Sequence, residues 1–410
     1  MPTLVQLVHG YPPREVAGTE LYAARLTQAL HRRGWTVHVV AATRAPGRDH
    51  GSVQEEEHPH GSVLRLVNNL PWRPLGHAEK DGLIEGRVRQ ALARLRPDVV
   101  HVQHLLFLSA HLRLRGAVCT LHDAWAWCPR GGNLLQNGKS PCPGPSAARC
   151  VPCYGDWARG YAVEHALGRL AGGASRVVAP ETLHKAWRRL PAKLRGLTRR
   201  GAPPKDTAAD FEQRQQAVHA AFARMRLLSP SAWLADRAAE QGLSAALLPH
   251  GVEAAQRWRG GGPLVFIGSL APHKGAHLAK AVGARIYGPA VDADYASTLG
   301  HHGALEPEAV PGVLAGAEAL VMGSLWPENA PLIVLEARAA GCPVIAPRIG
   351  GLPELVQEGV DGFLYEAGDE EDLRAAVARL RAAGPLSPRP PQSFEQHVDR
   401  LLEHYGAVGA

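Results

Sequence analysis

The sequence lacks the two features that would send a chain to a membrane or across one. It has no amino-terminal segment in which basic residues precede an apolar stretch, and no uninterrupted run of about 18 apolar residues. We therefore expect a cytoplasmic protein. The G-x-G-x-x-G fingerprint is also missing, so nothing in the sequence favours nicotinamide or flavin binding.

Cysteine is scarce, with 6 residues in a chain of 410, and four of the six fall in one loop, 124–156, that is rich in glycine and proline. Clustered thiols in a cytoplasmic chain indicate a metal site more than disulfides. The spacing C-x13-C-x7-C-x2-C holds a single C-x-x-C pair, so reduced thiols without metal and an iron–sulfur or redox role stay open as alternatives. We predict a structural zinc site, which need not touch the chemistry, held by Cys128, Cys142, Cys150 and Cys153.

Aromatic and basic residues do not interleave along a stripe, as nucleic-acid binding usually requires, so we expect no nucleic-acid partner. The net charge of +7 instead favours anionic partners: a nucleoside diphosphate, a lipid-linked acceptor or an acidic membrane surface. The arginine excess also fits a G+C-rich genome. The basic segment 185–205 could rest peripherally on the acidic inner face of a membrane, or be a solvated helical face.

Short apolar runs alternate with amphipathic segments along the chain. Continuous apolar runs are typical of parallel strands covered on both faces, and the alternation predicts a doubly wound α/β architecture. A chain of 410 residues can bury two cores of this kind. The predicted strands are 3–8, 36–41, 99–102, 118–121, 246–248, 264–267, 319–322 and 344–346.

We expect a second domain to begin near the glycine run 260–262, which a new apolar strand follows. We therefore assign residues 1–258 to an N-terminal domain and 259–390 to a C-terminal domain. Residues 391–410 follow a proline-rich linker and carry a final helix, which could cross back to the first domain.

Two carboxylates, Glu328 and Glu336, flank the predicted start of a helix over 331–340, in which Pro331 fits the first helical position. The free N–H groups at such a start form an anion site, and Glu336 would lie roughly 7 Å further along at about 1.5 Å per residue. The order carboxylate, phosphate site, carboxylate matches the sugar, diphosphate and ribose of an activated sugar donor. A chance pair on a solvated helix face is the alternative. The N–H groups of residues 330–333 form the predicted anion site, and Asn329 or Ala330 would cap the helix. The predicted donor-binding residues of this segment are Asn329, Ala330, Pro331, Leu332 and Ile333.

The sequence on either side of the segment from Glu328 to Glu336 favours a sugar-donor site over a chance pair of glutamates. Apolar strands precede and follow it, and Gly350-Gly351 comes next. In this setting the chain resembles the large retaining glycosyltransferase family often called family four, or group 1, whose hallmark is a glutamate, seven residues and a second glutamate. The resemblance covers nearly the whole chain. It implies the GT-B fold, in which two Rossmann-like doubly wound domains face each other across a cleft.

The resemblance also implies roles on the donor side. Glu336 would bind the ribose hydroxyls, Glu328 would lie near the transferring sugar, and Lys274 would bind the diphosphate together with the helix amides. Gly268 ends the strand before Lys274, and Ser269 stands where the family usually has arginine. Losing this cation should weaken neutralisation of the leaving group, unless Ser269 donates a hydrogen bond and another residue supplies charge.

In the N-terminal domain, the resemblance implies a donor-binding role for Gly18 and a catalytic role for His122. Gly18 matches a loop glycine that lets backbone N–H groups approach the donor phosphate or the acceptor, although the family often has two glycines there. His122 follows a predicted strand and would contact the transferring sugar or the acceptor, without acting as a nucleophile. His101 and His104 could line the acceptor side.

Together these features predict a retaining glycosyltransferase that moves a sugar from a nucleoside diphosphate sugar to an acceptor hydroxyl by front-face attack. No cofactor or catalytic metal is expected. The acceptor would be a glycan, a lipid-linked glycan or a small metabolite, as in polysaccharide biosynthesis. One alternative is a catalytically impaired nucleotide-binding partner subunit, suggested by Ser269. Another is a related GT-B sugar phosphorylase or epimerase.

Overall fold

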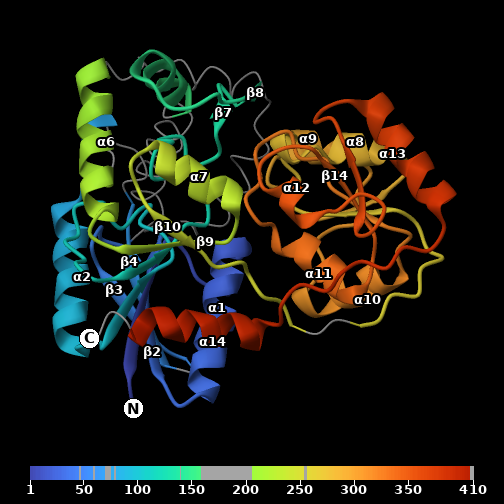
Figure 1. The fold of residues 1–410 in the computed structure, drawn as a ribbon. Coiled ribbons are helices and arrows are strands. Elements are labelled where there is room, and N and C mark those ends of the chain that lie inside the picture. Colours follow the sequence, from blue (N-terminus) through green and yellow to red (C-terminus); the bar gives the residue numbers. More distant parts are fainter. Residues whose placement is uncertain are drawn as a thin grey trace, which may run out of the picture. The chain divides into compact units, whose positions relative to one another are not determined.

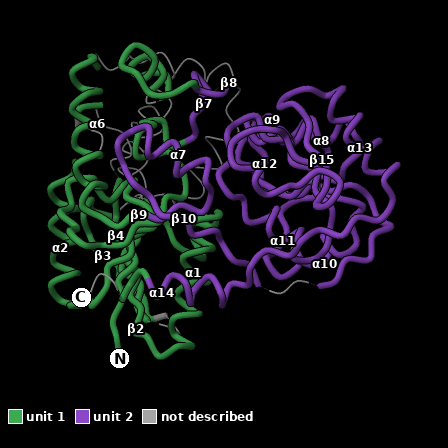
Figure 2. Tube along the Cα trace, viewed as in Figure 1, with its two compact units in different colours: residues 1–132, 143–227, 404–410 green, residues 133–142, 228–403 purple. Residues whose placement is uncertain are grey.

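The computed structural model describes residues 1–45, 48–58, 61–69, 75–77, 80–138, 140–157, 206–253 and 256–406. The basic segment 185–205 lies outside these residues. Contacts within the chain define two compact units, shown in green and purple in Figure 2. The first comprises 1–132, 143–227 and 404–410, and the second 133–142 and 228–403. Among the described helices, none has the length and apolar character needed to span a membrane.

The first sheet contains eight strands, which are β1 (Thr3–Val8), β2 (Thr36–Thr43), β3 (Val53–His58), β4 (Gly61–Val67), β5 (Val99–Val102), β6 (Val118–Thr120), β9 (Arg226–Ser229) and β10 (Ala245–Leu247). Their order is β10-β9-β6-β5-β1-β2-β4-β3. The central pairs, β6–β5, β5–β1, β1–β2 and β2–β4, are parallel, whereas the edge strand β3 runs antiparallel to β4. The carboxyl ends of β1, β5 and β6 therefore meet at one edge of the sheet, where ligands bind in open α/β folds.

The helices associated with this sheet are α1 (Gly18–Arg32), the short η1 (Leu75–His77), α2 (Gly82–Leu95), α6 (Ala208–Phe222) and α7 (Ala232–Glu240) (Figure 1). Side-chain caps begin several of them: Asp81 accepts from two N–H groups of α2, and Thr207 and Asp210 form a capping box on α6. A small hairpin, β7 (Leu135–Gln136) and β8 (Ser140–Pro141), lies within the cysteine-containing loop.

The second unit contains a parallel sheet of five strands in the order β12-β11-β13-β14-β15. The strands are β11 (Val265–Ile267), β12 (Arg285–Tyr287), β13 (Leu320–Val321), β14 (Val344–Pro347) and β15 (Gly362–Tyr365). Neighbouring residues of one strand enter different cores: Phe266 packs in one cluster and Val265 in the other. This alternation places a hydrophobic layer on each face of the sheet, as a doubly wound fold requires.

Besides α7, the second unit contains the helices η3 (Pro272–Lys274), α8 (Ala276–Ala281), α9 (Ala293–Ser297), η4 (Pro307–Ala309), α10 (Val310–Gly316), α11 (Leu332–Ala340), α12 (Leu352–Leu355), α13 (Glu370–Ala383) and most of α14 (Phe394–Gly406). Residues of α8 and α13 contribute to one core, and residues of α10, α11 and α12 to the other. The sheet is therefore covered by helices on both faces.

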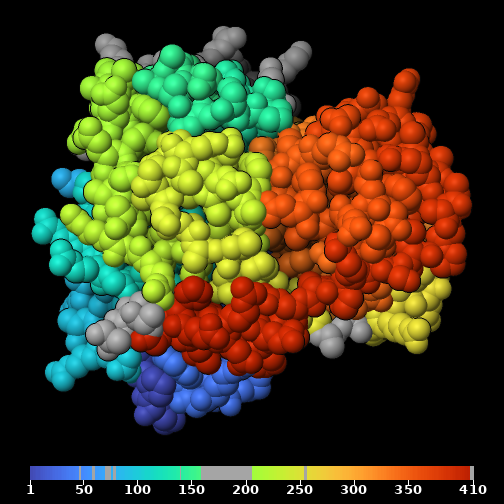
Figure 3. Space-filling model, viewed as in Figure 1, coloured from blue at the N-terminus to red at the C-terminus, as the bar shows by residue number. Residues whose placement is uncertain are grey.

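The last helix, α14, is amphipathic. Phe394, His397, Val398, Leu401 and Tyr405 are buried and recur at helical spacing, whereas the residues between them are mostly exposed. Its exposed face is visible in red in Figure 3. The helix joins the two units through the chain, since residues up to 403 belong to the second unit and those from 404 to the first.

The eight predicted strands all form, each within two residues of its predicted ends, and the final helix begins at the predicted residue. The start of the helix predicted over 331–340 was wrong by one residue. Pro331 is the N-cap, with φ −64° and ψ 125°, and the helix begins at Leu332. The φ value of proline suits either position, so the extended ψ decides, and neither Asn329 nor Ala330 caps the helix.

Candidate functional site

Glu328 lies in the loop that connects β13 to α11, and three donors converge on one of its carboxylate oxygens. The Lys274 ammonium, the Ser324 hydroxyl and the Trp326 indole N–H each lie 2.8 Å from Oε1. The residue is 5% exposed. Three donors fill the acceptor capacity of this oxygen, so Oε2 is the atom through which Glu328 can accept from a ligand.

The backbone beside Glu328 is held by two glycines. The Gly351 N–H donates to the Glu328 carbonyl at 2.7 Å, and a Cβ at Gly350 would lie 2.2 Å from the same oxygen. A Cβ at Gly351 would lie 2.1 Å from the carbonyl oxygen of Asn329. Only glycine permits this approach without moving the loop, so the Gly350-Gly351 pair fixes the position of the Glu328 backbone.

Lys274 reaches Glu328 from the short helix η3 that follows β11. Gly275, with φ +65°, packs so tightly on Gly323 that a Cβ would lie 1.7 Å from the Gly323 carbonyl oxygen. This backbone contact brings the two loops together. The Lys274 ammonium also lies 4.5 Å from the ring centroid of Trp326, a cation–π distance. Its side chain is 24% exposed, and an ammonium has three N–H donors, so it can bind Glu328 and a further anion together.

The first turn of α11 lies immediately after Glu328 in the chain. The N–H groups of Leu332 and Ile333 begin the helix and have no acceptor within it, so they form the positive end of the helix dipole. Pro331 contributes no N–H group. Asn329 is buried, and its side-chain oxygen accepts from the Ser231 hydroxyl. Of the anion site predicted over 330–333, the amides of Ala330, Leu332 and Ile333 can therefore donate, and their role in binding an anion stays a prediction.

Three other predicted donor-side residues lie in the second unit, on α11 and directly after β11. Glu336 is half-buried on α11, one turn after Leu332. Gly268 follows β11 and donates its N–H to the Tyr287 carbonyl at 3.0 Å. Ser269 is next in the chain and half-buried. Of the predicted donor-side residues, the structure joins Lys274 and Glu328 by direct contact. The roles of all five stay predictions.

In the first unit, His122 follows β6 and its Nε2 lies 2.9 Å from the side-chain oxygen of Gln103. The ring also packs edge-on against Tyr22, with 5.1 Å between the centroids. His101 is fully buried on β5, bonded to Thr120 through Nε2 and to the hydroxyl of Tyr405 through Nδ1. His101 is therefore part of the protein interior and does not line a surface.

Two carboxylate–imidazole pairs lie side by side near His122. His9 Nε2 is 3.1 Å from Glu20, His104 Nε2 is 3.2 Å from Asp123, and the two imidazole centroids are 4.4 Å apart. Burial alone would raise the pKa of Glu20, but His9 outweighs it and the pKa is lowered. Burial likewise opposes ionisation of Asp123, yet His104 and the Trp125 N–H lower its pKa. Both carboxyl groups are therefore ionised at neutral pH.

This cluster contains two buried polar atoms without a hydrogen-bond partner, Oε2 of Glu20 and Nδ1 of His9. Glu20 is 4% exposed, so bulk water does not compensate these atoms. A buried polar atom without a partner is costly, and such atoms in a native protein often await a ligand or an ordered water. The pair Glu20 and His9 is therefore a candidate site for a group that can donate hydrogen bonds.

Gly18 is the first residue of α1, exposed, with open space where a Cβ would stand. Neither its φ nor packing among the described residues demands glycine, and the approach of a ligand at this position stays a prediction. The loop before it is fixed by the buried Arg65, whose guanidinium donates to the carbonyls of Tyr11 and Pro12.

The four cysteines of the predicted zinc site are all described. Cys128, Cys150 and Cys153 are buried and Cys142 is half-buried, and Arg130 lies 3.7 Å from the Cys153 sulfur. Within the described part of the chain, no group of three or more His, Cys, Asp or Glu residues is arranged so that it could hold a metal ion. The zinc site therefore stays a prediction.

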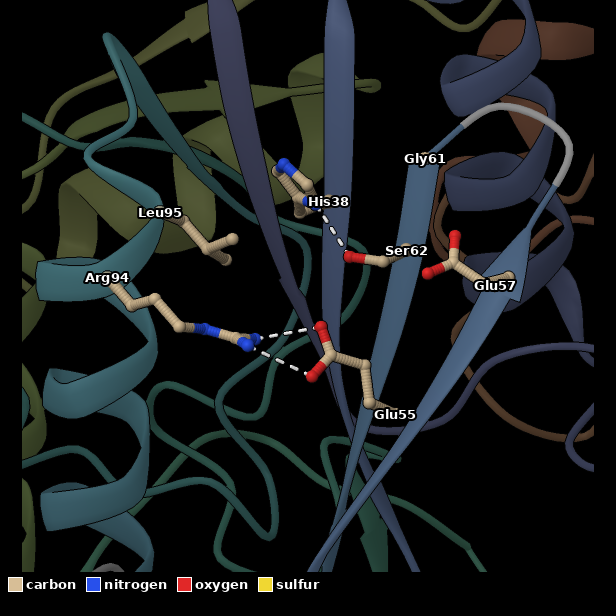
Figure 4. A pocket seen from close by; sticks show the side chains of 7 residues that line it. All are labelled: His38, Glu55, Glu57, Gly61, Ser62, Arg94 and Leu95. Atoms are coloured by element: carbon tan, nitrogen blue, oxygen red, sulfur yellow. Dashed lines mark hydrogen bonds and ion pairs between the residues drawn. The ribbon is translucent and has the colours of Figure 1, made fainter.

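A pocket elsewhere in the first unit is lined by residues of β2, β3, β4 and the end of α2 (Figure 4). Arg94 binds both oxygens of Glu55, at 3.0 and 2.9 Å, and His38 bonds to Ser62 at 2.6 Å. Burial and then the nearby Arg94 lower the pKa of His38. The pocket contains none of the residues predicted to bind a ligand, and its arginine is paired with Glu55.

Sequence reasoning missed several residues that the structure brings into the sites. Ser324 and Trp326 lie four and two residues before Glu328, and this closeness in sequence is the signal that could have identified them. The sequence gives no such signal for Gln103 and His9, because the residues that they contact are far away in the sequence.

Comparisons with known proteins add independent information. Residues 16–185 match a family model described as Glycosyltransferase Family 4, and residues 262–382 match one described as Glycosyl transferases group 1. A D-inositol 3-phosphate glycosyltransferase from Geodermatophilus obscurus is 41% identical over 87 residues, or 20% of this chain and 19% of that protein. The matched part therefore spans about a fifth of that relative's length.

Two solved structures resemble the chain over nearly its full length. Sucrose-phosphate synthase from Thermosynechococcus elongatus aligns with a TM-score of 0.62 at 16% identity, covering 100% of this chain and 96% of that one. The Anabaena protein HepE in complex with UDP aligns with a TM-score of 0.54 at 14% identity, covering 100% and 97%. At such identities the likeness concerns the fold.

Proposed function

The chain belongs to the group 1, or family 4, glycosyltransferases and has their GT-B fold, and from this we propose that it transfers a sugar from a nucleoside diphosphate sugar to an acceptor hydroxyl, with retention of configuration. The observation that carries the proposal is the convergence of Lys274, Ser324 and Trp326 on one oxygen of Glu328, directly before the start of α11.

The donor would bind along this segment of the second unit. Lys274 uses its remaining N–H groups for the diphosphate, together with the helix amides of Leu332 and Ile333. Glu328 offers Oε2 to the sugar, and Glu336, one turn into the helix, binds the ribose hydroxyls. The UDP in the Anabaena structure supports a uridine nucleotide as the first donor to test.

The chemistry needs no nucleophile from the protein. The bond between the anomeric carbon and the β-phosphate oxygen breaks, and the acceptor oxygen attacks from the same face, so configuration is retained. The acceptor proton passes to the departing phosphate. Lys274 and the α11 amides stabilise the charge that develops on the diphosphate, and the Glu328 carboxylate stabilises positive charge on the sugar.

The acceptor would bind to the first unit through hydroxyl groups. Oε2 of Glu20 and Nδ1 of His9 are buried without partners, and a hydroxyl can donate to either. An ionised Glu20 repels a phosphate at the same place. We therefore propose a neutral, hydroxyl-rich acceptor end, as in a glycan, a lipid-linked glycan or a polyol metabolite.

The first experiment is a thermal-shift panel of UDP-, GDP- and ADP-sugars on the wild-type protein and on Glu336→Ala. We expect one donor class to raise the melting temperature of the wild type, and the shift to be lost in Glu336→Ala. Glu371→Ala is the matched control, because Glu371 is an exposed glutamate on another helix of the same unit. It should keep the full shift.

Two results would overturn the proposal. The first is the absence of a shift with every nucleotide sugar at millimolar concentration. The second is an equal shift in all three proteins, which would mean that the nucleotide binds elsewhere. Retention is tested on the product by NMR of its anomeric proton, since an inverted product excludes front-face attack.

One observation favours a second candidate, a catalytically impaired partner subunit that binds nucleotide without transferring the sugar. Ser269 stands at the position of the usual arginine, which leaves Lys274 to neutralise the diphosphate while it also binds Glu328. This candidate would be selected if the protein binds the donor but neither transfers the sugar nor slowly hydrolyses the donor. In that case Ser269→Arg should raise turnover.

A further inference from the structure

A chain of amide hydrogen bonds in the first unit begins at a backbone carbonyl. Gln6 on β1 donates from Nε2 to the Ala23 carbonyl at 3.0 Å and to the Thr27 hydroxyl at 2.7 Å. A carbonyl oxygen can only accept, so the bond to Ala23 identifies the nitrogen end of the Gln6 amide. The Gln6 oxygen must then be the acceptor for Nε2 of Gln103, at 2.8 Å.

The orientation of Gln103 determines the proton position on His122. Because Nε2 of Gln103 faces Gln6, its oxygen faces Nε2 of His122 at 2.9 Å. This amide oxygen can only accept, so Nε2 of His122 carries a proton. In the neutral ring, Nδ1 then holds a lone pair and can accept a hydrogen bond but not donate one.

We propose that Gln6 and Gln103 are positioning residues for His122, which hold its neutral ring in the form that presents Nδ1 as a hydrogen-bond acceptor to a hydroxyl of the bound sugar or acceptor. The inference rests on the proposed function, which supplies the hydroxyl. In the other neutral form, or in the charged ring, Nδ1 would carry a proton and could not accept the hydroxyl's hydrogen.

Burial makes this arrangement hard to reverse. Gln6 is 0% and Gln103 1% exposed, so water does not replace a lost partner. The Gln103 amide nitrogen also lies 3.2 Å from Nδ1 of His101, which accepts the Tyr405 hydroxyl at 2.7 Å. A reversed Gln103 would place its oxygen against two acceptors, Gln6 Oε1 and His101 Nδ1. Reversing the Gln103 amide would therefore replace two hydrogen bonds with two repulsive contacts between acceptors, which opposes the reversal.

The titratable groups near His122 come from several elements. Tyr22 on α1 contacts the ring, Asp123 follows it in the chain, and His101 on β5 and Tyr405 on α14 continue the network. Burial raises the pKa of both tyrosines, which therefore stay neutral hydrogen-bond donors. Asp123 and Glu20 are the ionised neighbours, and they are paired with His104 and His9 respectively.

The test is ¹⁵N NMR of protein labelled in its histidine rings, with the His122 signals identified by their loss in His122→Ala. In the wild type above the ring's titration, we expect the proton on Nε2. In Gln103→Leu, which removes the acceptor, we expect a mixture of both neutral forms. A wild-type ring with its proton on Nδ1 would overturn the inference, and this measurement needs no activity.

A second arm follows the His122 titration and the pH dependence of turnover in Gln103→Glu. A carboxylate beside Nε2 stabilises the charged ring, so the titration and the acid limb of kcat should both move up by about one pH unit or more. Gln216→Glu adds the same charge on the exposed face of α6 and should move neither. Equal titrations in the two variants contradict the positioning role, whereas failure of donor binding with the expected NMR result contradicts only the proposed function.

Discussion

The two units differ in hydrogen-bonding character at the residues proposed to bind ligands. In the second unit, an ammonium and helix amides offer donors to the diphosphate, and one oxygen of Glu328 is already filled by three donors. In the first unit, Oε2 of Glu20 and Nδ1 of His9 are buried acceptors without partners. Donors suit a diphosphate and acceptors suit hydroxyl groups, so each unit matches one half of the proposed reaction.

The difference also concerns how each site is held. Close backbone contacts position Lys274 and Glu328. Gly275 packs against Gly323, and Gly350 packs against the Glu328 carbonyl, with no space for a side chain at either glycine. In the first unit, side-chain amides and imidazoles hold one another in a buried network. Backbone contacts tolerate a change of charge better than a hydrogen-bonded network, in which each group fixes the orientation of the next.

The largest effect is expected from Glu328→Gln, which removes the charge on which three donors converge. Turnover should fall by about 10² to 10³, with little change in donor KM, because the lost interaction strengthens as the sugar gains positive charge. Steady-state kinetics with the donor found in the thermal-shift panel measures both constants.

Ser324→Ala is the control for this prediction, since it removes one of the three donors and leaves the charge. It should lower turnover by about tenfold, the cost of one charge-assisted hydrogen bond. If turnover falls equally little in both variants, Glu328 is not the residue that faces the sugar, and the donor site assigned to the second unit is wrong.

The sequence predicts the strands well, for physical reasons, whereas the roles of the donor-side residues stay predictions. Apolar runs long enough for one strand mark buried parallel strands, and Lys274 and Glu328 stand beside glycines that permit close loops. The position of Pro331 was missed because its φ suits both the N-cap and the first helical turn. The contact between Gln6 and Gln103 depends on the register of β1 against β5, which pairs Gln6 with His101 and which local sequence does not encode.

A pH change should separate the units by stability. Burial lowers the pKa of His397, on α14 in the second unit, to about 4, below the ordinary value of about 6.5. Between these values the unfolded chain binds a proton that the folded chain does not, so stability falls as pH falls through this range and is unaffected above it. The expected loss is about 2–4 kcal/mol between pH 6.5 and 4.

Urea unfolding at a series of pH values measures this loss, with His397→Gln as the comparison. Glutamine does not titrate, and its amide can still donate to the Pro249 carbonyl that the imidazole contacts at 2.8 Å. Its stability curve should be flatter below pH 6.5 than that of the wild type. In the first unit, Glu20 and Asp123 have lowered pKa values and keep their imidazole partners until lower pH. Parallel curves for the two proteins would assign the acid sensitivity to other groups.

The smallest effect is expected from Glu20→Gln, which replaces an acceptor oxygen with a donor amide in the first unit. The glutamine oxygen can still accept from His9, so the fold should be kept, while a ligand hydroxyl loses its acceptor at Oε2. Acceptor KM should rise about tenfold, the value of one such hydrogen bond, and donor binding should not change. Glu212→Gln, on the exposed face of α6, is the matched control and should alter neither constant. A loss of donor binding in Glu20→Gln would contradict the division of labour between the units, because a residue of the first unit would then bind the nucleotide sugar.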